Sequence, residues 1–187
     1  MTAYTILLLA VAAERVAELA VSQRHLRWAR ERGALESGQG HYPVMVVVHI
    51  ALLVGCLVEV HALDRPFVAW LGWPMLAVVV VAQALRWWCI ATLGSQWNTR
   101  VVVVPGLPLV DRGPYRWLRH PNYVAVVAEG VALPLVHDAW LTAVLFTAAN
   151  SVLLSVRIRC ENRLLAVAAP ASAAAGRPAG DRAVSER

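Results

Sequence analysis

The chain is 187 residues long; 59% of its residues are hydrophobic, 16% are charged, and its formal net charge at pH 7 is +5. A soluble domain has about a quarter of its residues charged. This composition argues against one, because several fully apolar helices would need burial with little amphipathic material to cover them. Apolar runs that cross lipid must satisfy their backbone amides internally, as helices do. The sequence therefore predicts an all-α integral membrane protein.

Apolar runs along the chain predict about five transmembrane helices. A run of about 18 or more nearly uncharged residues is long enough to cross a hydrocarbon layer of roughly 30 Å. We expect the first three helices at residues 3–21, 42–63 and 67–93. The first run lacks a basic start and a small-residue cleavage pattern, so we interpret it as a retained helix and not as a signal peptide.

The last apolar block, residues 123–156, contains Pro134, His137 and Asp138, which predict a tight turn between two helices. Together these elements are expected to form a single transmembrane domain over residues 1–165. The chain beyond residue 165 is rich in Ala, Pro, Gly and Ser with alternating charges, which predicts a disordered tail over residues 166–187.

The basic residues, all of them arginine, gather in the segments that flank the apolar runs. Residues 22–41 and 94–122 hold four arginines each, whereas the connection at residues 137–139 holds none. Cytoplasmic loops of inner or plasma membrane proteins carry the excess of positive charge. We therefore expect these loops and the C-terminus in the cytoplasm and the N-terminus outside. Because the arginines have this topological explanation, no nucleic-acid partner is expected.

Ionisable residues inside a membrane span are costly and suggest function by default. Among those within the predicted helices are Glu14, Arg15, Glu18, Arg86 and Glu129. For the first three, an ion pair that fastens the first helix to a neighbour and a functional role both remain open. A pair between Arg86 and Glu129 is a further hypothesis. For His41 and His49, a structural role and contact with a substrate both remain open.

A polar pocket is expected at the cytosolic ends of the last two helices. Because these helices form a hairpin, residues 119–123 should enter the membrane close to where residues 157–162 leave it. Arg157 and Glu161 are four residues apart and share one face of a helix. The pocket would combine guanidinium, carboxylate, imidazole and aromatic groups. The three cysteines lack the spacing of a metal or disulfide site, so no metal is expected.

Two segments closely resemble the hallmark of the isoprenylcysteine carboxyl methyltransferase family. The hallmark is Gly-x-Tyr, then Arg-His-Pro-x-Tyr, and a late Arg-x-x-x-Glu-Glu. Residues 113–123 read GPYRWLRHPNY and residues 157–162 read RIRCEN. The resemblance covers roughly residues 90–165, and the number of predicted spans is similar to that of small bacterial members.

The resemblance implies that this part of the chain binds S-adenosyl-L-methionine and transfers its methyl group. The cofactor-binding residues that we expect are Tyr115, His120, Pro121, Tyr123, Glu129, Glu161, Gln96 and Trp97. The residues expected to act in the transfer are Arg157, His120, Arg119 and Asn162. The chain departs from the hallmark at Asn162, where the family has its second glutamate, although the amide keeps an acceptor oxygen.

Two upstream segments resemble a narrower bacterial branch: residues 41–43, HYP, and residues 93–100, LGSQWNTR. Members of that branch accompany type III polyketide synthases and O-methylate long-chain alkylpyrones and alkylresorcinols. The resemblance implies a lipophilic acceptor that arrives from the bilayer and a functional link to such a synthase. A phenolic hydroxyl with a pKa of roughly 10 would benefit from a nearby base or cation.

Three other functions remain open. One is an isoprenylcysteine-type carboxyl methyltransferase, and a second is an NADPH-dependent membrane reductase of the sterol-reductase type. The sequence shows no clear additional basic site for a 2′-phosphate, although Arg112 and Arg116 keep the reductase open. The third is a non-catalytic membrane scaffold or lipid-binding subunit, which would not require Glu129 inside an apolar helix.

Overall fold

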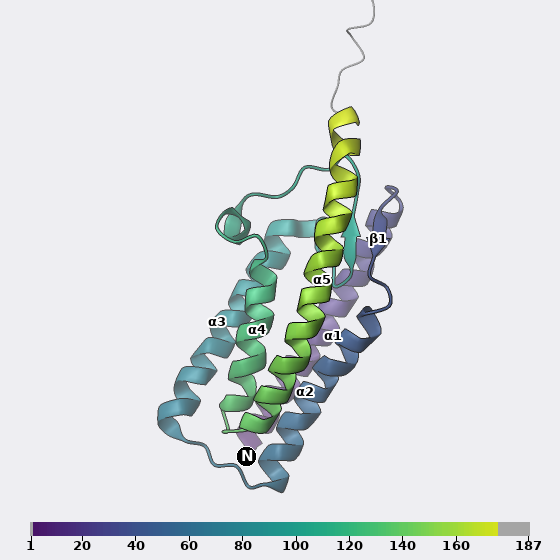
Figure 1. Cartoon of the computed structure of the whole chain (residues 1–187). Coiled ribbons are helices and arrows are strands. Elements are labelled where there is room, and N and C mark those ends of the chain that lie inside the picture. The colour runs from purple at the N-terminus through teal and green to yellow at the C-terminus, as the bar shows by residue number, and fades with distance from the viewer. Residues whose placement is uncertain (1, 176–187) are drawn as a thin grey trace, which may run out of the picture.

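The computed structural model describes residues 2–175, and side chains as far as residue 167. Within the described residues, five α-helices form an elongated bundle (Figure 1). Their bounds are Thr2–Arg30 (α1), Tyr42–Ala62 (α2), Ala69–Leu93 (α3), Pro121–Leu135 (α4) and Trp140–Ala175 (α5). The break that was predicted within residues 123–156 is the α4–α5 connection, where Asp138 has a positive φ of 53°. The five expected helices are therefore present.

Three of the helices are long and apolar enough to cross a membrane, judged by length and composition over the described residues: Tyr42–Ala62, Ala69–Gln96 and Trp140–Val167. The other two do not meet that criterion. Charged residues interrupt α1, and α4 has only 15 residues. The structure thus contains five helices, of which three have the character of independent membrane spans.

Three expectations from the sequence are corrected. The fold is not purely helical, because Leu35–Ser37 (β1) pairs antiparallel with Val101–Val103 (β2). The first helix continues to Arg30, well past the apolar run that ends at residue 21, because the arginine-rich segment is also helical. The tail was expected to begin at residue 166, but α5 continues through Ala175; residues 176–187 lie outside the described residues.

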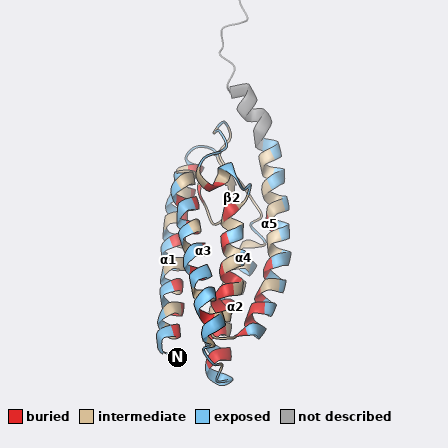
Figure 2. Ribbon diagram, turned by 90° about the vertical axis from the view of Figure 1, so that its left-hand side faces the viewer, coloured by how far each residue is buried: buried red, intermediate tan, exposed pale blue. Residues whose placement is uncertain are grey.

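The apolar core lies in the half of the bundle that contains the N-terminus, away from the strands (Figures 1 and 2). Every helix contributes to it, with Leu8 from α1, Cys56 from α2, Val79 from α3, Leu133 from α4 and Phe146 from α5. The hydroxyl group of Tyr4 donates a hydrogen bond to the carbonyl oxygen of Leu133 at 2.9 Å, which satisfies a polar group inside this core. The opposite half is less tightly filled and contains the cavities described below.

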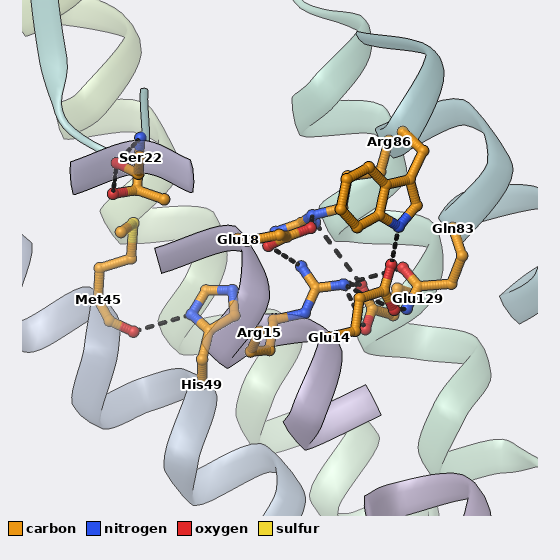
Figure 3. Close-up of polar contacts among 11 residues, drawn as sticks. Glu14, Arg15, Glu18, Ser22, Met45, His49, Gln83, Arg86 and Glu129 are labelled. Carbon is orange, nitrogen blue, oxygen red and sulfur yellow. Dashed lines mark hydrogen bonds and ion pairs between the residues drawn. The ribbon is translucent and has the colours of Figure 1, made fainter. Parts of the chain in front are cut away.

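A buried ion network connects α1 to α3 and α4 (Figure 3). Arg15 contacts Glu18 at 2.8 Å and Glu129 at 3.2 Å, and Arg86 contacts the same two carboxylates at 2.5 and 3.6 Å. Gln83 adds hydrogen bonds to Arg15 and Glu14. The expected pair between Arg86 and Glu129 is confirmed. The network also explains the charges of α1 at Glu14, Arg15 and Glu18, since each of them has a partner of opposite sign.

We predict that Arg86→Met lowers the free energy of unfolding by about 3–5 kcal/mol, because it leaves buried carboxylates short of positive charge. Denaturant unfolding of the purified protein in mild detergent, followed by tryptophan fluorescence, measures the change. The double variant Arg86→Met/Glu18→Met should recover part of the loss, since it removes one carboxylate together with its cation. Equal stability of Arg86→Met and the parent would contradict a stabilising network.

Glu36, on β1, connects the two strands to the end of α1. Its carboxylate accepts hydrogen bonds from Arg100 at 2.8 Å and from Arg30 at 3.1 Å. Burial acts to raise the pKa of Glu36, but the hydrogen bonds and charges of the two arginines outweigh burial and lower it below its ordinary value of 4.5. A carboxyl group with a lowered folded-state pKa stabilises the fold above its unfolded pKa and loses that effect as the pH falls through the folded pKa.

We therefore predict that Glu36→Gln lowers the melting temperature at neutral pH, and that the difference from the parent disappears as the pH falls well below 4.5. Thermal unfolding of both proteins across this range is the measurement. Glu31→Gln is the matched control, because the Glu31 side chain is 73% exposed and an exposed pair contributes little. A difference that persists unchanged into acid would contradict this role of Glu36.

Candidate functional site

Four irregular or short elements at the polar end of the bundle surround a cavity. They are the 3₁₀ turn Gly94–Gln96 (η1) after α3, strand β2, the 3₁₀ turn Gly113–Arg116 (η2) and the start of α4. Gly113 has a φ of +57°, and a Cβ there would lie 2.6 Å from Oγ1 of Thr92, so the turn can approach α3 only with glycine. Pro121 then begins α4, a position that suits proline because the first helical amide needs no partner.

This cavity, called cavity A, has a volume of about 320 Å³. Nine of the residues that the sequence predicted for the site line it: Gln96, Trp97, Tyr115, Arg119, His120, Tyr123, Arg157, Glu161 and Asn162. They come from three separate parts of the chain, residues 96–97, 115–123 and 157–162. The hairpin argument therefore placed the two later segments correctly, because α4 and α5 bring them to the same cavity.

Tyr123 connects α4 to α5 at the floor of cavity A. Its hydroxyl group donates a short hydrogen bond to the carboxylate of Glu161 and accepts one from Nε of Arg157 at 2.9 Å. The ring of His120 stacks on the Tyr123 ring with centroids 5.2 Å apart, and its Nδ1 lies 3.7 Å from Glu161. Nη1 of Arg157 also contacts the sulfur of Met45 on α2 at 3.1 Å. These contacts hold the Arg157 guanidinium group in a defined position.

Two polar atoms in the wall of cavity A are buried without a hydrogen-bond partner among the described residues. They are Nε1 of Trp97 and Oδ1 of Asn122. The Trp97 side chain is held in place, since its residue is 3% exposed and its carbonyl oxygen contacts Nδ1 of His25 at 2.9 Å. A buried donor and a buried acceptor without partners are costly unless a ligand or water satisfies them. Asn122 was not among the site residues expected from the sequence. Its position directly after His120 and Pro121 could have indicated that it lines the site.

Two predicted cofactor residues do not line cavity A. Pro121 is fully buried at the first position of α4. Glu129 lies in the ion network with Arg15 and Arg86 and not in cavity A. Glu129 follows Tyr123 by six residues on α4, which carries it about 9 Å further along the helix.

A second cavity, called cavity B, lies deeper in the bundle and has a volume of about 330 Å³. Its lining is mostly apolar and comes largely from α1, α2, α4 and α5, with Val16, Leu53, Val126 and Leu154 among its residues. Charged members of the ion network also reach it. The sequence did not predict this cavity, although it left the role of two of its lining residues, His41 and His49, open.

Cavities A and B share four lining residues: Trp97, Asn122, Tyr123 and Arg157. They therefore meet at the Tyr123–Arg157 contact, with cavity A, of mixed polar and apolar lining, on the strand side and the largely apolar cavity B on the other. Burial acts to lower the pKa of His41, at the mouth of cavity B, and the charge of Arg157 lowers it further. His41 thus favours its neutral form beside this junction.

A scan against family models matches residues 75–167 to the isoprenylcysteine carboxyl methyltransferase (ICMT) family. The uncharacterised protein YpbQ of Bacillus subtilis is 41% identical over 153 residues, which cover 81% of this chain and 90% of YpbQ. An uncharacterised protein of Haemophilus influenzae is 24% identical over 165 residues, which cover 87% of this chain and 94% of that protein. The matched region contains both hallmark segments and nearly all of cavity A. The chain belongs to the ICMT family.

Proposed function

We propose that this protein is an S-adenosylmethionine-dependent O-methyltransferase whose lipophilic acceptor enters from the bilayer. Family membership implies a membrane methyltransferase that uses S-adenosylmethionine. The observation that carries the finer proposal is the pair of adjoining cavities that meet at Tyr123 and Arg157: cavity A has charged and polar groups among apolar residues, and cavity B is largely apolar. A methyltransferase for lipophilic acceptors needs such a pair, because its two substrates differ in polarity and must meet at one point.

The lining of cavity A fits the chemistry of S-adenosylmethionine. Arg119 offers a guanidinium group for a carboxylate, and Asn162 and Glu161 offer acceptor oxygens for an amine or ribose hydroxyls. Tyr115 and Tyr123 offer aromatic rings for an adenine or a cationic sulfur. When bound, S-adenosylmethionine supplies an activated methyl group.

Arg157 is the residue best placed to act on the acceptor. Tyr123 and Met45 fix its guanidinium group where the two cavities meet. A guanidinium group in a largely apolar cavity stabilises an oxygen anion, whether carboxylate or phenolate, and orients it for attack. His120 packs on Tyr123 and contacts Glu161, so its role lies on the cofactor side of the junction.

For the acceptor, our proposal is a long-chain alkylpyrone or alkylresorcinol, with a functional link to a type III polyketide synthase. It is supported by the upstream segments that resemble the corresponding branch, since His41, Tyr42, Trp97 and Thr99 from those segments line cavity B. The description of the matched family favours a different acceptor, the carboxyl group of an isoprenylcysteine. Arg157 would suit both, because both acceptors present an oxygen anion.

We further propose a topology with five membrane-crossing helices, the N-terminus outside, and cavity A on the cytoplasmic side. The arginine-rich segments support this orientation, because β1, β2 and η2 all lie at the same end of the bundle. In α1, the charges that lower its apolar character are paired with α3 and α4. Such pairing is how ionisable groups are tolerated within a membrane.

The function is tested by incubating the detergent-solubilised protein with methyl-labelled S-adenosylmethionine and three acceptors: an alkylpyrone, an alkylresorcinol and a farnesylated cysteine analogue. We expect label in the pyrone or the resorcinol, and a loss of at least about 100-fold in Arg157→Ala, because a charged group that contacts the reacting oxygen is removed. Label only in the farnesylated analogue would keep the methyltransferase and replace the acceptor. No labelled product from any acceptor would contradict the proposal.

Cofactor binding tests the placement of Glu161 and Glu129. We predict that Glu161→Gln weakens binding of S-adenosylhomocysteine by about tenfold or more, because it removes a charged acceptor in cavity A. Glu129→Gln should leave the affinity within about twofold, since residue 129 lies outside the cavity and distant substitutions act independently. Isothermal titration calorimetry on the folded protein measures both affinities. A larger loss in Glu129→Gln than in Glu161→Gln would contradict the site described here.

A further inference from the structure

Asn150 is a buried polar residue in cavity B without a partner. It lies in the middle of α5, it is 5% exposed, and it lines the cavity. Within the described residues, no hydrogen bond reaches its side-chain amide, and the oxygen and nitrogen are not sealed off by neighbouring atoms. Asn150 is thus a lining residue of cavity B whose amide keeps some accessible surface. An amide that is buried and unpaired in this way costs free energy unless something in the cavity binds it.

His49 on α2 presents a second polar atom to the same cavity. Its Nδ1 contacts the carbonyl oxygen of Met45 at 2.8 Å (Figure 3). A carbonyl oxygen only accepts, so Nδ1 is the donor, and in a neutral imidazole Nε2 is left with a lone pair. Among the described residues Nε2 has no hydrogen-bond partner, and the His49 ring lines cavity B.

The two residues lie on α2 and α5, which pack against each other, and both line the cavity. The His49 ring makes an edge-on contact with Phe146 on α5, with centroids 5.4 Å apart. Phe146 precedes Asn150 by four residues, which is about one helical turn, or roughly 6 Å. Asn150 in turn precedes Arg157 by seven residues, about 10 Å along the same helix. The pair His49–Asn150 thus lies deeper in cavity B than the Arg157 guanidinium group.

We propose that His49 and Asn150 form a second polar subsite in cavity B, which binds an oxygen of the acceptor headgroup other than the oxygen that is methylated. The inference rests on the proposed function, because it takes cavity B as the acceptor site. Nε2 of His49 accepts a hydrogen bond from an acceptor hydroxyl group, and the amide of Asn150 donates to the same oxygen or accepts from it. Arg157 holds the reacting oxygen at the junction.

This arrangement selects a class of acceptor. A ring that carries two oxygens, such as a resorcinol or a hydroxypyrone, satisfies both Arg157 and the deeper pair. A ring with one oxygen leaves the pair buried without partners. Sites that bind a hydroxyl group by hydrogen bonds reject the analogue that lacks it, because their own polar groups are then left unpaired.

The test compares an alkylresorcinol with the alkylphenol of the same chain length, which lacks one hydroxyl group. Binding of each to the full-length protein in detergent is measured without S-adenosylmethionine, by quenching of tryptophan fluorescence. We expect the parent to bind the resorcinol about tenfold or more tightly relative to the phenol. In Asn150→Leu and in His49→Leu this preference should fall close to one, because the second hydroxyl no longer has its partner.

His61→Leu is the matched control. His61 lies on the same helix and makes the same kind of contact with the carbonyl oxygen four residues earlier, at 2.9 Å, but it is exposed and lines neither cavity. It should keep the full preference for the resorcinol. Partitioning of the ligands into detergent is common to all variants, so it cancels when their preferences are compared.

An unchanged preference in both Asn150→Leu and His49→Leu, with the variants folded, would overturn the inference. An equal loss in His61→Leu would overturn it too, since the effect would then not come from the cavity. The proposed function fails in a different way. If neither ligand is methylated but the preference for the resorcinol is present and depends on Asn150, cavity B binds such rings. In that case the inference stands and the proposed methyl transfer is wrong.

Discussion

The position of α1 depends on the ion network that joins it to α3 and α4, and cavity B depends on the position of α1. Halfway along, α1 carries three charges that lipid would not tolerate singly. The guanidinium groups of Arg15 and Arg86 neutralise Glu18 and Glu129 within one cluster. Because Arg15, Glu18 and Arg86 also line cavity B, the same contacts that hold the helix form part of the cavity wall. A packed apolar interface would have closed this space.

The second constraint is the contact between α4 and α5 at Tyr123. One phenolic hydroxyl group joins a guanidinium group to a carboxylate, so that Arg157, Tyr123 and Glu161 form a single chain of contacts. These contacts lie between cavity A and cavity B and contribute residues to both. These contacts explain why the late Arg/Glu segment and the His-Pro turn form one site. The two segments are distant in the sequence, since 33 residues lie between Tyr123 and Arg157.

Much of this arrangement was predictable from the sequence, because it follows from local patterns. Apolar run lengths predict the helices, and proline with Asp138 predicts the turn between α4 and α5. This connection between α4 and α5 also predicts that the two hallmark segments lie close together. The pairing of β1 with β2 was not predictable, because each strand has three residues and the two are far apart in the chain. The location of Glu129 and the existence of cavity B also depend on contacts between distant helices.

The location of Glu129 outside cavity A has a physical cause. An intramembrane carboxylate is expected to have a function, and its distance from the His-Pro turn along α4 is short. Its partners, however, come from α1 and α3, and no local pattern indicates which face of α4 they cover. An uncharged polar residue in an apolar run attracts less attention in the sequence than a charged one, but Asn150 gives the further inference its evidence. Asn150 is inconspicuous in an apolar run, yet it lines cavity B and its amide has no hydrogen-bond partner among the described residues.

The central claim is that S-adenosylmethionine binds in cavity A, beside the Tyr123–Arg157 contact. The most direct measurement is photolabelling of the purified protein with radioactive S-adenosylmethionine under ultraviolet light, followed by identification of the labelled peptides by mass spectrometry. The account predicts label within residues 94–123 and 157–165, and its disappearance when excess S-adenosylhomocysteine is present. Competed label that falls instead in α1 or α2 would contradict the account.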